Sequence, residues 1–410
     1  MKTTERAVAP QKLAAQLLEN YEAGSSFFFA SPRRTLLAQG TFATVPHVGG
    51  ASSLERLPER VAAVLSEARQ ADHDIPVAVG AVPFDGSVPA QLVVPMTIQR
   101  AGPLVFDDVA MPYQGVPTRY TVQPVPEPAA YLDGVAQALK LMESGPLRKV
   151  VLSRSLHLSA TTPIDLQRLL HNLARRNPSG YTFAADLPTR PGMMPGEGRR
   201  TLIGASPELL VSRSGMQVLA NPLAGSIPRS PDPVEDQARA AGLLQSPKDL
   251  HEHAVVIDAV AEAMRPFCET LDVPAKPSLV STQTMWHLSS RIVGELADPS
   301  ITSLTLAVAL HPTPAVCGYP TQLAHATIGH IEPFERGYYT GTVGWCDVNG
   351  DGQWAVTIRC AEADENSLRL FAGAGIVAGS KPESELAETE AKFRTMLVAM
   401  GLGQGVEVKP

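Results

Sequence analysis

The chain has 410 residues, of which 44% are hydrophobic and 18% are charged, a balance typical of a soluble globular protein and not of a disordered or membrane-embedded one. Its net charge of −7 gives no general attraction to polyanions, so we expect neither nucleic acid nor an anionic membrane surface as a partner. The N-terminus carries no apolar signal segment and no apolar run approaches the ~18 residues of a spanning helix, so we expect a cytoplasmic protein. The four cysteines include no C-x-x-C pair, which argues against a zinc knuckle, a redox motif or a disulfide scaffold.

The first part of the chain is predicted to form a mixed α/β region without a site motif. A strand-like run lies at 26–30, and apolar periodicity predicts a helix over 54–71. Prolines are dense between residues 112 and 128, which interrupts regular structure and indicates a connector. We therefore expect an N-terminal region, 1–128, packed on a larger region, 129–402, as one compact unit.

The larger region opens with a predicted helix, 129–144, and a strand, 148–154, in which Lys149 shares one face with Val151 and Ser153. By default such a lysine lies at a sheet edge with its ammonium in solvent, and Glu208 is by default an acid at the start of a strand. If Lys149 is enclosed instead, it can serve as a general base. The residues alone favour the plain structural role for both. The Pro- and Gly-rich stretch 189–198 is predicted to be a surface loop without a chemical role.

Two pairs of acids occur at helical spacing on different predicted helices. Asp249 and Glu252 are three residues apart on a helix predicted over 249–267, and Glu385 and Glu388 have the same spacing near the C-terminus. Each pair therefore projects from one helix face. A solvated helix face is the plain alternative for any single pair. Mg²⁺ takes one or two carboxylates together with waters and a substrate oxygen, so the two pairs favour a magnesium site.

The C-terminal stretch 368–392 combines an apolar run, the glycines Gly373 and Gly375, and a helix on which Lys392 shares the face of the acids. This combination predicts a site for a metal and an anion. The glycines formally match the dinucleotide fingerprint G-x-G-x-x-A. That interpretation fails because Pro382 falls where the fingerprint's helix should run, and too little chain follows for the rest of a nucleotide-binding half. We expect the glycines to form a tight turn from strand to helix.

Other charged and aromatic residues give weaker signals. Arg359 is predicted to end a strand, 354–359, where burial would require an anionic partner, either a substrate carboxylate or a protein acid. His287 is isolated, so a hydrogen-bonded core position is the safer expectation. His251 and His253 flank an acid and suggest zinc, but alternate helix positions point apart and no H-E-x-x-H motif is present. Oxygen-ligated magnesium is favoured.

Together, the residues described above and the sequence segments around them resemble the chorismate-utilising enzymes. The resemblance is closest to the isochorismate synthases of the siderophore type, which feed 2,3-dihydroxybenzoate synthesis. The matching pieces lie in family order from about residue 140 to the end, so the joint match is highly specific, whereas the first third resembles the family more loosely. They are 147–154 (LRKVVLSR), 204–210 (GASPELL), 222–226 (PLAGS), 248–253 (KDLHEH), 285–288 (MWHL), 311–318 (HPTPAVCG), 344–347 (GWCD), 357–360 (TIRC) and 371–377 (FAGAGIV).

The resemblance implies an α+β fold like that of anthranilate synthase component I, with large antiparallel sheets flanked by helices. It also implies an isomerase that converts chorismate to isochorismate with Mg²⁺, by attack of water at C2 and loss of the C4 hydroxyl. Lys149 corresponds to the general base that activates water, and Glu208 to the general acid that protonates the departing hydroxyl. Lys149 must then be neutral and Glu208 protonated at the moment of reaction.

The resemblance further assigns ligands. The family's magnesium ligands match Glu252 and Glu388, with Glu385 and Asp249 in supporting positions, and the metal would bind the ring carboxylate of chorismate. Positions that hold the enolpyruvyl carboxylate match Arg359, Tyr339, Lys392 and the backbone of Gly373, and positions that line the site match His287, Gly225 and Ser226.

Residues 315 and 316 bear on the subclass. Anthranilate and salicylate synthases, which eliminate pyruvate, usually carry threonine at the position of Ala315, so Ala315-Val316 favours an enzyme that stops at isochorismate. Tyr339 resembles the tyrosine of salicylate synthases, which keeps a pyruvate lyase as the alternative, beside an amination enzyme that uses ammonia from a glutaminase partner. A nucleotide-binding protein is a remote alternative. The resemblance implies a monomer whose product a downstream isochorismatase could take, and the pathway, dihydroxybenzoate, salicylate or menaquinone, stays open.

Overall fold

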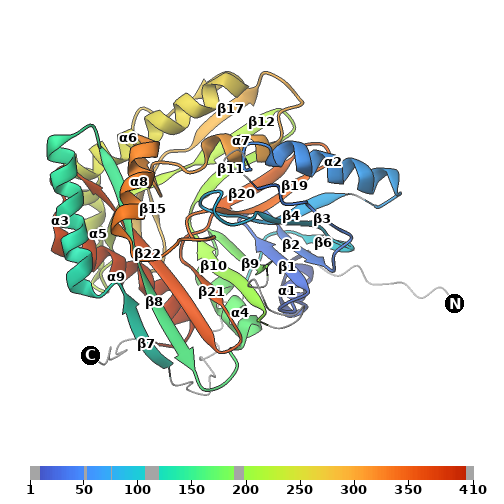
Figure 1. Ribbon diagram of the computed structural model, residues 1–410, viewed down its shortest axis with the longest axis horizontal. Coiled ribbons are helices and arrows are strands. Elements are labelled where there is room, and N and C mark those ends of the chain that lie inside the picture. The colour runs from blue at the N-terminus through green and yellow to red at the C-terminus, as the bar shows by residue number, and fades with distance from the viewer. Residues whose placement is uncertain (1–9, 50–52, 75, 107–119, 189–197, 403–410) are drawn as a thin grey trace.

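The computed structural model describes residues 10–49, 53–74, 76–106, 120–188 and 198–402. Within these residues the strands form two large antiparallel sheets and a small third sheet, and helices cover their outer faces (Figure 1). Large antiparallel sheets flanked by helices are the architecture that the sequence predicts.

The three sheets draw their strands from the whole length of the chain. The ten-stranded sheet runs β18 (Gly318–Tyr319), β8 (Lys149–Ala160), β22 (Ser367–Val377), β21 (Cys360–Ala363), β10 (Arg200–Ser206), β9 (Tyr181–Leu187), β1 (Ser26–Ala30), β2 (Thr35–Gln39) and β6 (Thr97–Ala101), and β7 (Tyr120–Val125) also pairs with β8. The nine-stranded sheet runs β14 (Cys268–Asp272), β17 (Ile292–Leu296), β12 (Gln217–Asn221), β11 (Leu209–Ser214), β20 (Gly352–Val356), β19 (Thr342–Asp347), β4 (Val77–Val82), β5 (Gln91–Val94) and β3 (Ala43–Thr44). The small sheet is β13 (Leu223–Pro228), β16 (Met285–Ser289) and β15 (Ser278–Ser281).

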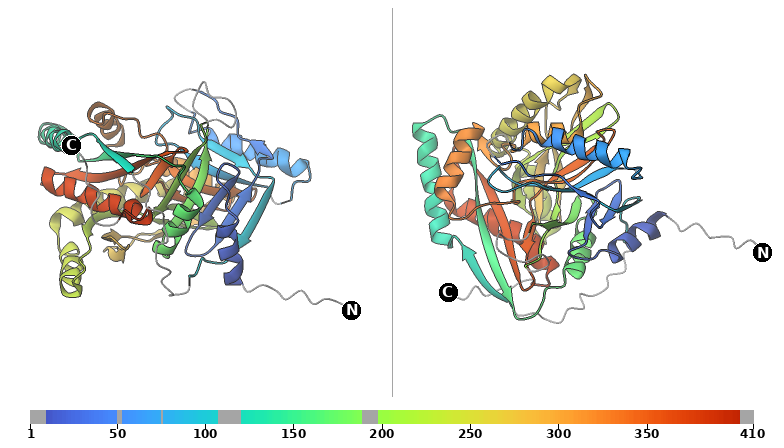
Figure 2. Two further views of the ribbon diagram at one scale, coloured as in Figure 1. Left: turned by 90° about the horizontal axis from the view of Figure 1, so that it is seen from below. Right: turned by 45° about the vertical axis from the view of Figure 1, so that its right-hand side comes forward.

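The helices gather at the outer faces of the sheets. They are α1 (Pro10–Glu19), α2 (Leu57–Gln70), α3 (Pro128–Ser144), α4 (Leu166–Arg176), α5 (Pro233–Leu243), α6 (Pro247–Met264), α7 (Ser303–Leu310), α8 (Thr321–Ile331) and α9 (Pro382–Ala399), with a short 3₁₀ turn at Arg265–Phe267. Helices α3 and α8 pack against β8, α9 packs against β22, and α6 packs against β13. Figure 2 shows α3 and α8 together on one side of the molecule and α2 on the other.

The two large sheets pack face to face through a shared apolar core. Phe29 of β1 and Phe183 of β9 lie in one cluster with Val79 of β4 and Trp345 of β19. Strand β1 is buried along its whole length because β2 and β9 flank it and its alternate side chains enter two different clusters, with Phe28 on the opposite face. This explains why β1 reads as a continuous apolar run and not as an alternating one.

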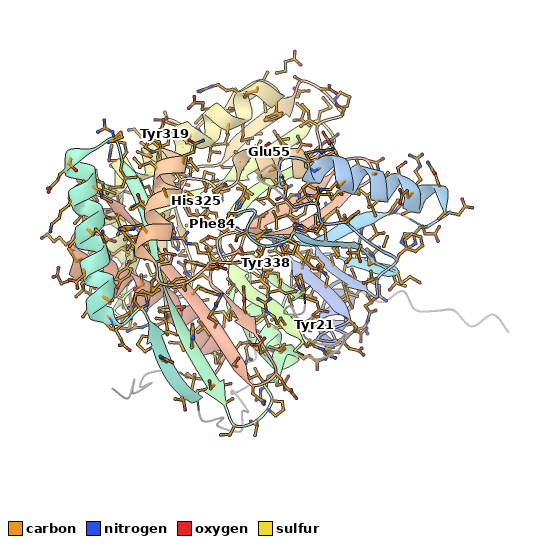
Figure 3. The ribbon with its side chains drawn as sticks, viewed as in Figure 1. Tyr21, Glu55, Phe84, Tyr319, His325 and Tyr338 are labelled. Carbon is orange, nitrogen blue, oxygen red and sulfur yellow. The ribbon has the colours of Figure 1, made fainter. Side chains whose placement is uncertain are left out.

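Residues before 128 are built into both large sheets. Strand β1 pairs with β9 in one sheet, and β4 pairs with β19 in the other. The segment after β4 also docks on α8, where the rings of Phe84 and His325 stack with centroids 5.2 Å apart (Figure 3). His325 Nε2 lies 3.1 Å from a carboxylate oxygen of Asp85. The described residues before 128 therefore share hydrogen-bonded sheets with the rest of the chain.

Two predicted helices are found where the sequence places them, whereas the end of the predicted connector is regular structure. Helix α3 matches the helix predicted over 129–144, and α6 with its 3₁₀ turn matches the one predicted over 249–267. The end of the proline-rich connector is instead strand β7, in which Pro124 pairs with Leu156 of β8. An edge strand tolerates proline because its outer side makes no ladder bonds. The predicted loop 189–198 lies outside the described residues except for its last position. Among the described helices, none is long and apolar enough to cross a membrane.

A buried ion pair ties β8 to the segment that follows α7. The guanidinium of Arg336 and the carboxylate of Glu332 are 1% and 2% exposed and lie 2.5 Å apart. Arg336 also donates to the carbonyl oxygens of Val316 and Val151, at 2.7 Å each, and Glu332 accepts the Ser153 backbone N–H at 2.8 Å. These bonds fix two backbone segments relative to each other.

We expect Arg336→Met to lower the free energy of unfolding by roughly 3–5 kcal/mol, because it leaves the Glu332 carboxylate buried without its cation. Urea denaturation followed by circular dichroism measures the change. Arg56→Met is the control, since the Arg56–Glu59 pair is more than two-thirds exposed, and its effect should be much smaller. Equal effects of the two substitutions would contradict this account.

Candidate active site

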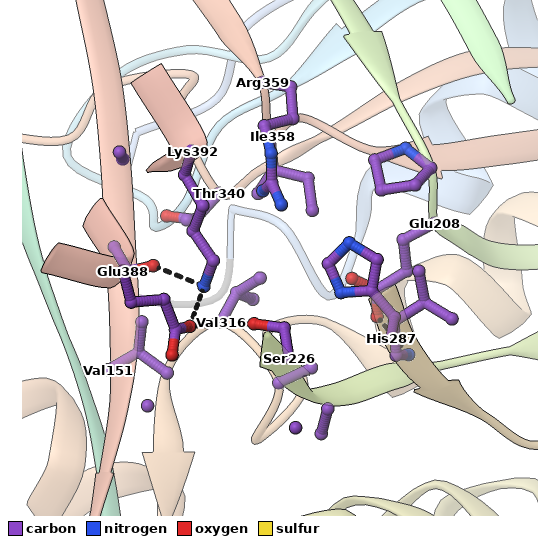
Figure 4. A pocket seen from close by; sticks show the side chains of 18 of the residues that line it. Val151, Glu208, Ser226, His287, Val316, Thr340, Ile358, Arg359, Glu388 and Lys392 are labelled. Carbon is purple, nitrogen blue, oxygen red and sulfur yellow. Dashed lines mark hydrogen bonds and ion pairs between the residues drawn. The ribbon is translucent and has the colours of Figure 1, made fainter. Parts of the chain in front are cut away.

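One pocket brings together most of the residues that the sequence analysis singled out. It lies where β22 and α9 face β13, β16 and the segment after β20, and it holds about 610 Å³ of space including its open mouth (Figure 4). The predicted residues that line it are Glu208, Gly225, Ser226, Glu252, His287, Ala315, Val316, Tyr339, Arg359, Gly373, Glu388 and Lys392.

Lys149 lies just behind this pocket and is only 1% exposed. Its Nζ donates to Oε1 of Glu252 on α6 at 2.8 Å. The default expectation of a solvent-facing edge lysine is therefore wrong. The reason is β18, a two-residue strand that covers the side of β8 opposite β22 and pairs Tyr319 with Lys149, so that Lys149 has a neighbouring strand on each side.

The glycines of β22 allow other side chains to reach the strand. A Cβ at Gly375 would lie 2.1 Å from Oε1 of Glu252, and one at Gly373 would lie 2.6 Å from Oγ of Ser153. Both glycines lie inside β22 and pair with β8, so the predicted turn at this position is wrong. The chain turns later, at Gly379, whose φ is +89°. Glycine is needed here for close approach and not for a bend.

Glu208 directly precedes β11, as the sequence predicts for an acid at the start of a strand, but its side chain is buried. The Leu223 backbone N–H donates to its Oε1 at 3.3 Å. Burial raises the pKa of this carboxyl to about 7, although the Leu223 N–H and the cations of Lys149 and Arg359 oppose the rise. The acid form is therefore well populated near neutral pH.

His287 of β16 points to the same part of the pocket as Glu208 (Figure 4). Its burial, together with the positive charges of Arg359 and Lys392, holds the pKa of the imidazole well below its usual range. Its Nε2 is buried and has no hydrogen-bond partner within the described ranges. A neutral imidazole with a free nitrogen facing the pocket can bond to a ligand hydroxyl. The expectation of a hydrogen-bonded core histidine is wrong.

Helix α9 supplies the opposite wall of the pocket. Lys392 Nζ lies 2.5 Å from Oε1 of Glu388 and donates to the carbonyl oxygen of Gly373 at 2.8 Å. The Ser226 hydroxyl donates to the same Glu388 oxygen at 2.9 Å. Burial alone would raise the pKa of Glu388, but the ion pair with Lys392 outweighs it and the pKa lies below its usual value. Glu388 is therefore ionised at neutral pH.

Glu385 and Asp249 stand beside the pocket and do not line it. Glu385 is 1% exposed, and Lys248 at the start of α6 lies 2.7 Å from its Oε1. Burial and the neighbouring Glu388 raise the pKa of Glu385. Burial also raises the pKa of Asp249, and Glu388 and Glu252 add to that rise, so the acids of α6 and α9 influence one another.

These carboxylates are oxygen donors of the kind that magnesium prefers, and they come from two helices, α6 and α9, which the Lys248–Glu385 ion pair joins. As the side chains stand, no group of three or more His, Cys, Asp or Glu in the described ranges is arranged to hold a metal ion. Their ammonium partners account for this arrangement, because Glu252, Glu385 and Glu388 each point to a lysine.

Arg359 lies where the chain crosses from one large sheet to the other. Strand β20 ends at Val356 and β21 begins at Cys360, so the predicted strand over 354–359 is too long. Arg359 has a φ of +52°, an unusual value for a residue with a side chain. Its Nε and Nη2 are buried and have no hydrogen-bond partner in the described part of the chain. A buried, unpaired guanidinium suits an anionic ligand.

Tyr339 stacks on Phe371 with ring centroids 4.7 Å apart, and its hydroxyl lies 3.2 Å from Oγ of Ser153. Sequence analysis missed several lining residues, none of them charged, although each lies within two positions of a predicted one. That proximity in sequence is the signal that could have found them. They are Val151, Pro207, Leu223, Ala224, Thr340, Ile358, Phe371 and Ala372.

Comparisons with known proteins agree on one family. Residues 105–401 match the family described as "Chorismate binding enzyme". The chain is 59% identical over 398 residues to isochorismate synthase DhbC of Bacillus subtilis, covering 97% of this chain and 99% of that protein. It is 54% identical, with a TM-score of 0.89, to the crystal structure of a putative 2,3-dihydroxybenzoate-specific isochorismate synthase, DhbC, from Bacillus anthracis, covering 95% of this chain and all of that one.

A more distant structure bears on the fold alone. Anthranilate synthase component I from Streptococcus pneumoniae is 21% identical to this chain, with a TM-score of 0.68 over 97% of this chain and 95% of that one. The α+β fold expected from the resemblance is therefore confirmed.

Proposed function

This chain belongs to the chorismate binding enzymes, and we propose that it is an isochorismate synthase. Such an isomerase converts chorismate to isochorismate, here for 2,3-dihydroxybenzoate and siderophore synthesis. The proposal rests on two separate buried groups, the amine of Lys149 and the carboxyl of Glu208. Burial raises the pKa of Glu208 to about 7. A reaction that adds water at one carbon and removes a hydroxyl from another needs one base and one acid.

In the proposed reaction Lys149 takes a proton from water, whose oxygen bonds to C2 as both ring double bonds shift by one position and the C4 hydroxyl departs. Glu208 gives its proton to that hydroxyl, which leaves as water, so that one water enters and one leaves. Lys149 needs a free electron pair for this role, so it must give up one proton of its ammonium; the neutral amine can still donate to Oε1 of Glu252. Burial of Glu208 keeps its proton available at neutral pH.

We propose that the cations of the pocket hold the enolpyruvyl carboxylate of chorismate. Arg359 has unpaired buried nitrogens, and Lys392, which donates to the carbonyl oxygen of Gly373, lines the same pocket (Figure 4). The hydroxyl of Tyr339 is a further donor in the same wall. His287, Gly225 and Ser226 complete the lining. An anion held between fixed cations keeps the ring in one orientation relative to the base and the acid.

We propose Mg²⁺ as the cofactor, held by Glu252 and Glu388 with Glu385 and Asp249 in support. When bound, the metal neutralises the ring carboxylate of chorismate and offsets its repulsion from these acids. The donor set supports this choice, because it consists of carboxylates and includes neither cysteine nor histidine: His251 is exposed, and His253 bonds to the Ala224 carbonyl and the Ser290 hydroxyl. We also propose a cytoplasmic monomer whose product supplies an isochorismatase.

Incubation of the protein with chorismate and Mg²⁺ should give isochorismate as the main product, identified by chromatography and mass spectrometry. Ala315 lies in the wall of the pocket, where pyruvate-eliminating relatives usually carry threonine. Salicylate and pyruvate as the main products would replace the proposal with its alternative, a salicylate synthase, for which the Tyr339 hydroxyl in the pocket is the supporting observation.

Lys149→Ala and Glu208→Gln should each lower kcat by about 10²–10⁴-fold, the usual contribution of general acid or base catalysis, with an unchanged circular dichroism spectrum. Because the acid form of Glu208 dominates below its pKa of about 7, wild-type activity through this group should fall about tenfold per pH unit above that value. The residual activity of Glu208→Gln should lack this limb. Glu295→Gln, at an exposed position of β17, is the control. A near-normal rate in either site variant would refute its role.

Gly375→Ala should lower turnover about 10²-fold, because the added methyl group cannot coexist with the present position of Glu252 and so displaces Glu252 and Lys149. Steady-state kinetics with chorismate measure the loss. Gly329→Ala is the matched control, since a Cβ there meets nothing within 4 Å. If Gly375→Ala turns over chorismate at the rate of Gly329→Ala, the close approach of Glu252 to β22 has no functional weight.

A further inference from the structure

Three of the four carboxylates proposed for the metal are occupied by ammonium groups of the protein itself. Each of three glutamates has its own lysine at ion-pair distance, and the pairs join α6, α9 and β8. The pairs are Lys149–Glu252 at 2.8 Å, Lys248–Glu385 at 2.7 Å and Lys392–Glu388 at 2.5 Å.

Lys248 differs from the other two lysines. Lys149 and Lys392 have proposed roles toward water and substrate, whereas Lys248 does not line the pocket. Its side chain is 31% exposed, while its partner Glu385 is 1% exposed. The ammonium therefore reaches a buried carboxylate from the solvent side and has room to swing back into water.

The position of Lys248 is fixed by the start of α6. The Ser246 hydroxyl accepts the Asp249 backbone N–H at 3.3 Å as the N-cap, and Pro247 opens the helix. Lys248 thus lies one turn before Glu252 on α6, and its ammonium interacts electrostatically with Glu252 and Glu388 as well as with Glu385. A single surface-reaching cation acts on all three acids.

A charge count shows what this cation does to the site. Four carboxylates, those of Asp249, Glu252, Glu385 and Glu388, face three ammonium groups, which leaves one net negative charge. A bound dication would turn this into one net positive charge and attract a dianionic substrate. Without Lys248 the cluster would have a net charge of two negative units instead of one. It would then bind a dication more strongly in the absence of substrate.

We propose that Lys248 is an internal counter-cation that competes with the divalent metal for Glu385, so that the metal binds weakly alone and more tightly together with the dianionic substrate. The inference rests on the metal site of the proposed function and adds a residue that tunes it. In the opposite role Lys248 would orient Glu385 for the metal, and its loss would weaken metal binding. The two roles predict changes of opposite sign.

Isothermal titration of the full-length protein with MgCl₂, without substrate, separates the two roles. Lys248→Met should bind Mg²⁺ about tenfold more tightly than wild type, whereas Lys248→Arg, which keeps the charge, should stay within about twofold. Lys381→Met is the matched control, because Lys381 is exposed and precedes α9 near the same acids without being the partner of Glu385. It should also stay within about twofold.

Thermal unfolding gives a second readout. Lys248→Met leaves the Glu385 carboxylate buried without its cation, so its metal-free melting temperature should lie below that of wild type. Mg²⁺ should raise the melting temperature of the variant more than that of wild type, because tighter binding to the folded state stabilises it further.

The outcomes separate this inference from the proposed function. Equal or weaker Mg²⁺ binding by Lys248→Met, with wild type binding Mg²⁺ and converting chorismate, overturns the role of Lys248 and leaves the proposed function intact. If neither protein binds Mg²⁺, both the role of Lys248 and the proposed metal site fall, and turnover of chorismate by wild type in a chelator then tests the reaction separately.

Discussion

Buried charge needs a partner of opposite charge, and this constraint organises the centre of the molecule. Lys149 on β8 meets Glu252 on α6, and Lys248 on α6 meets Glu385 on α9. Lys392 closes the set by bonding α9 to the backbone of β22. Elements that lie more than a hundred residues apart in the chain are thus joined at one place, which is also the place where a charged substrate must bind.

The charged groups that lack such a partner reach neutrality in other ways. Glu208 is buried, and its raised pKa lets it stay protonated. His287 stays neutral because burial and nearby cations lower its pKa. Arg359 cannot lose its proton, and its unpaired nitrogens therefore need an anion from outside the protein. The site contains a carboxylic acid, a neutral imidazole and an unsatisfied cation in one pocket, and such a set of groups suits the addition and removal of water on a dianion.

Local spacing predicted the parts of the site that lie on helices, since i, i+3 positions share a face whatever the tertiary structure. It could not predict burial at Lys149, because that depends on β18, a two-residue strand about 170 positions away in the sequence. It misread the glycines of β22 as a turn because they make room for side chains from other elements, Glu252 of α6 at Gly375 and Ser153 of β8 at Gly373. The same limit applies to Arg359, whose backbone changes direction where the chain passes from β20 in one large sheet to β21 in the other. Family resemblance supplied these positions because it carries tertiary information that propensities lack.

The weaving of the first strands into both large sheets limits how the chain can be divided. If the residues up to 128 were removed, β9 would lose β1 and β19 would lose β4, so two long central strands would become open edges with unpaired backbone groups. The apolar faces that meet between the sheets would be uncovered in the same step. The part of the chain after residue 128, which carries the pocket residues, is thus not an independent folding unit. We expect a protein shortened to this part to associate with other copies of itself through those edges.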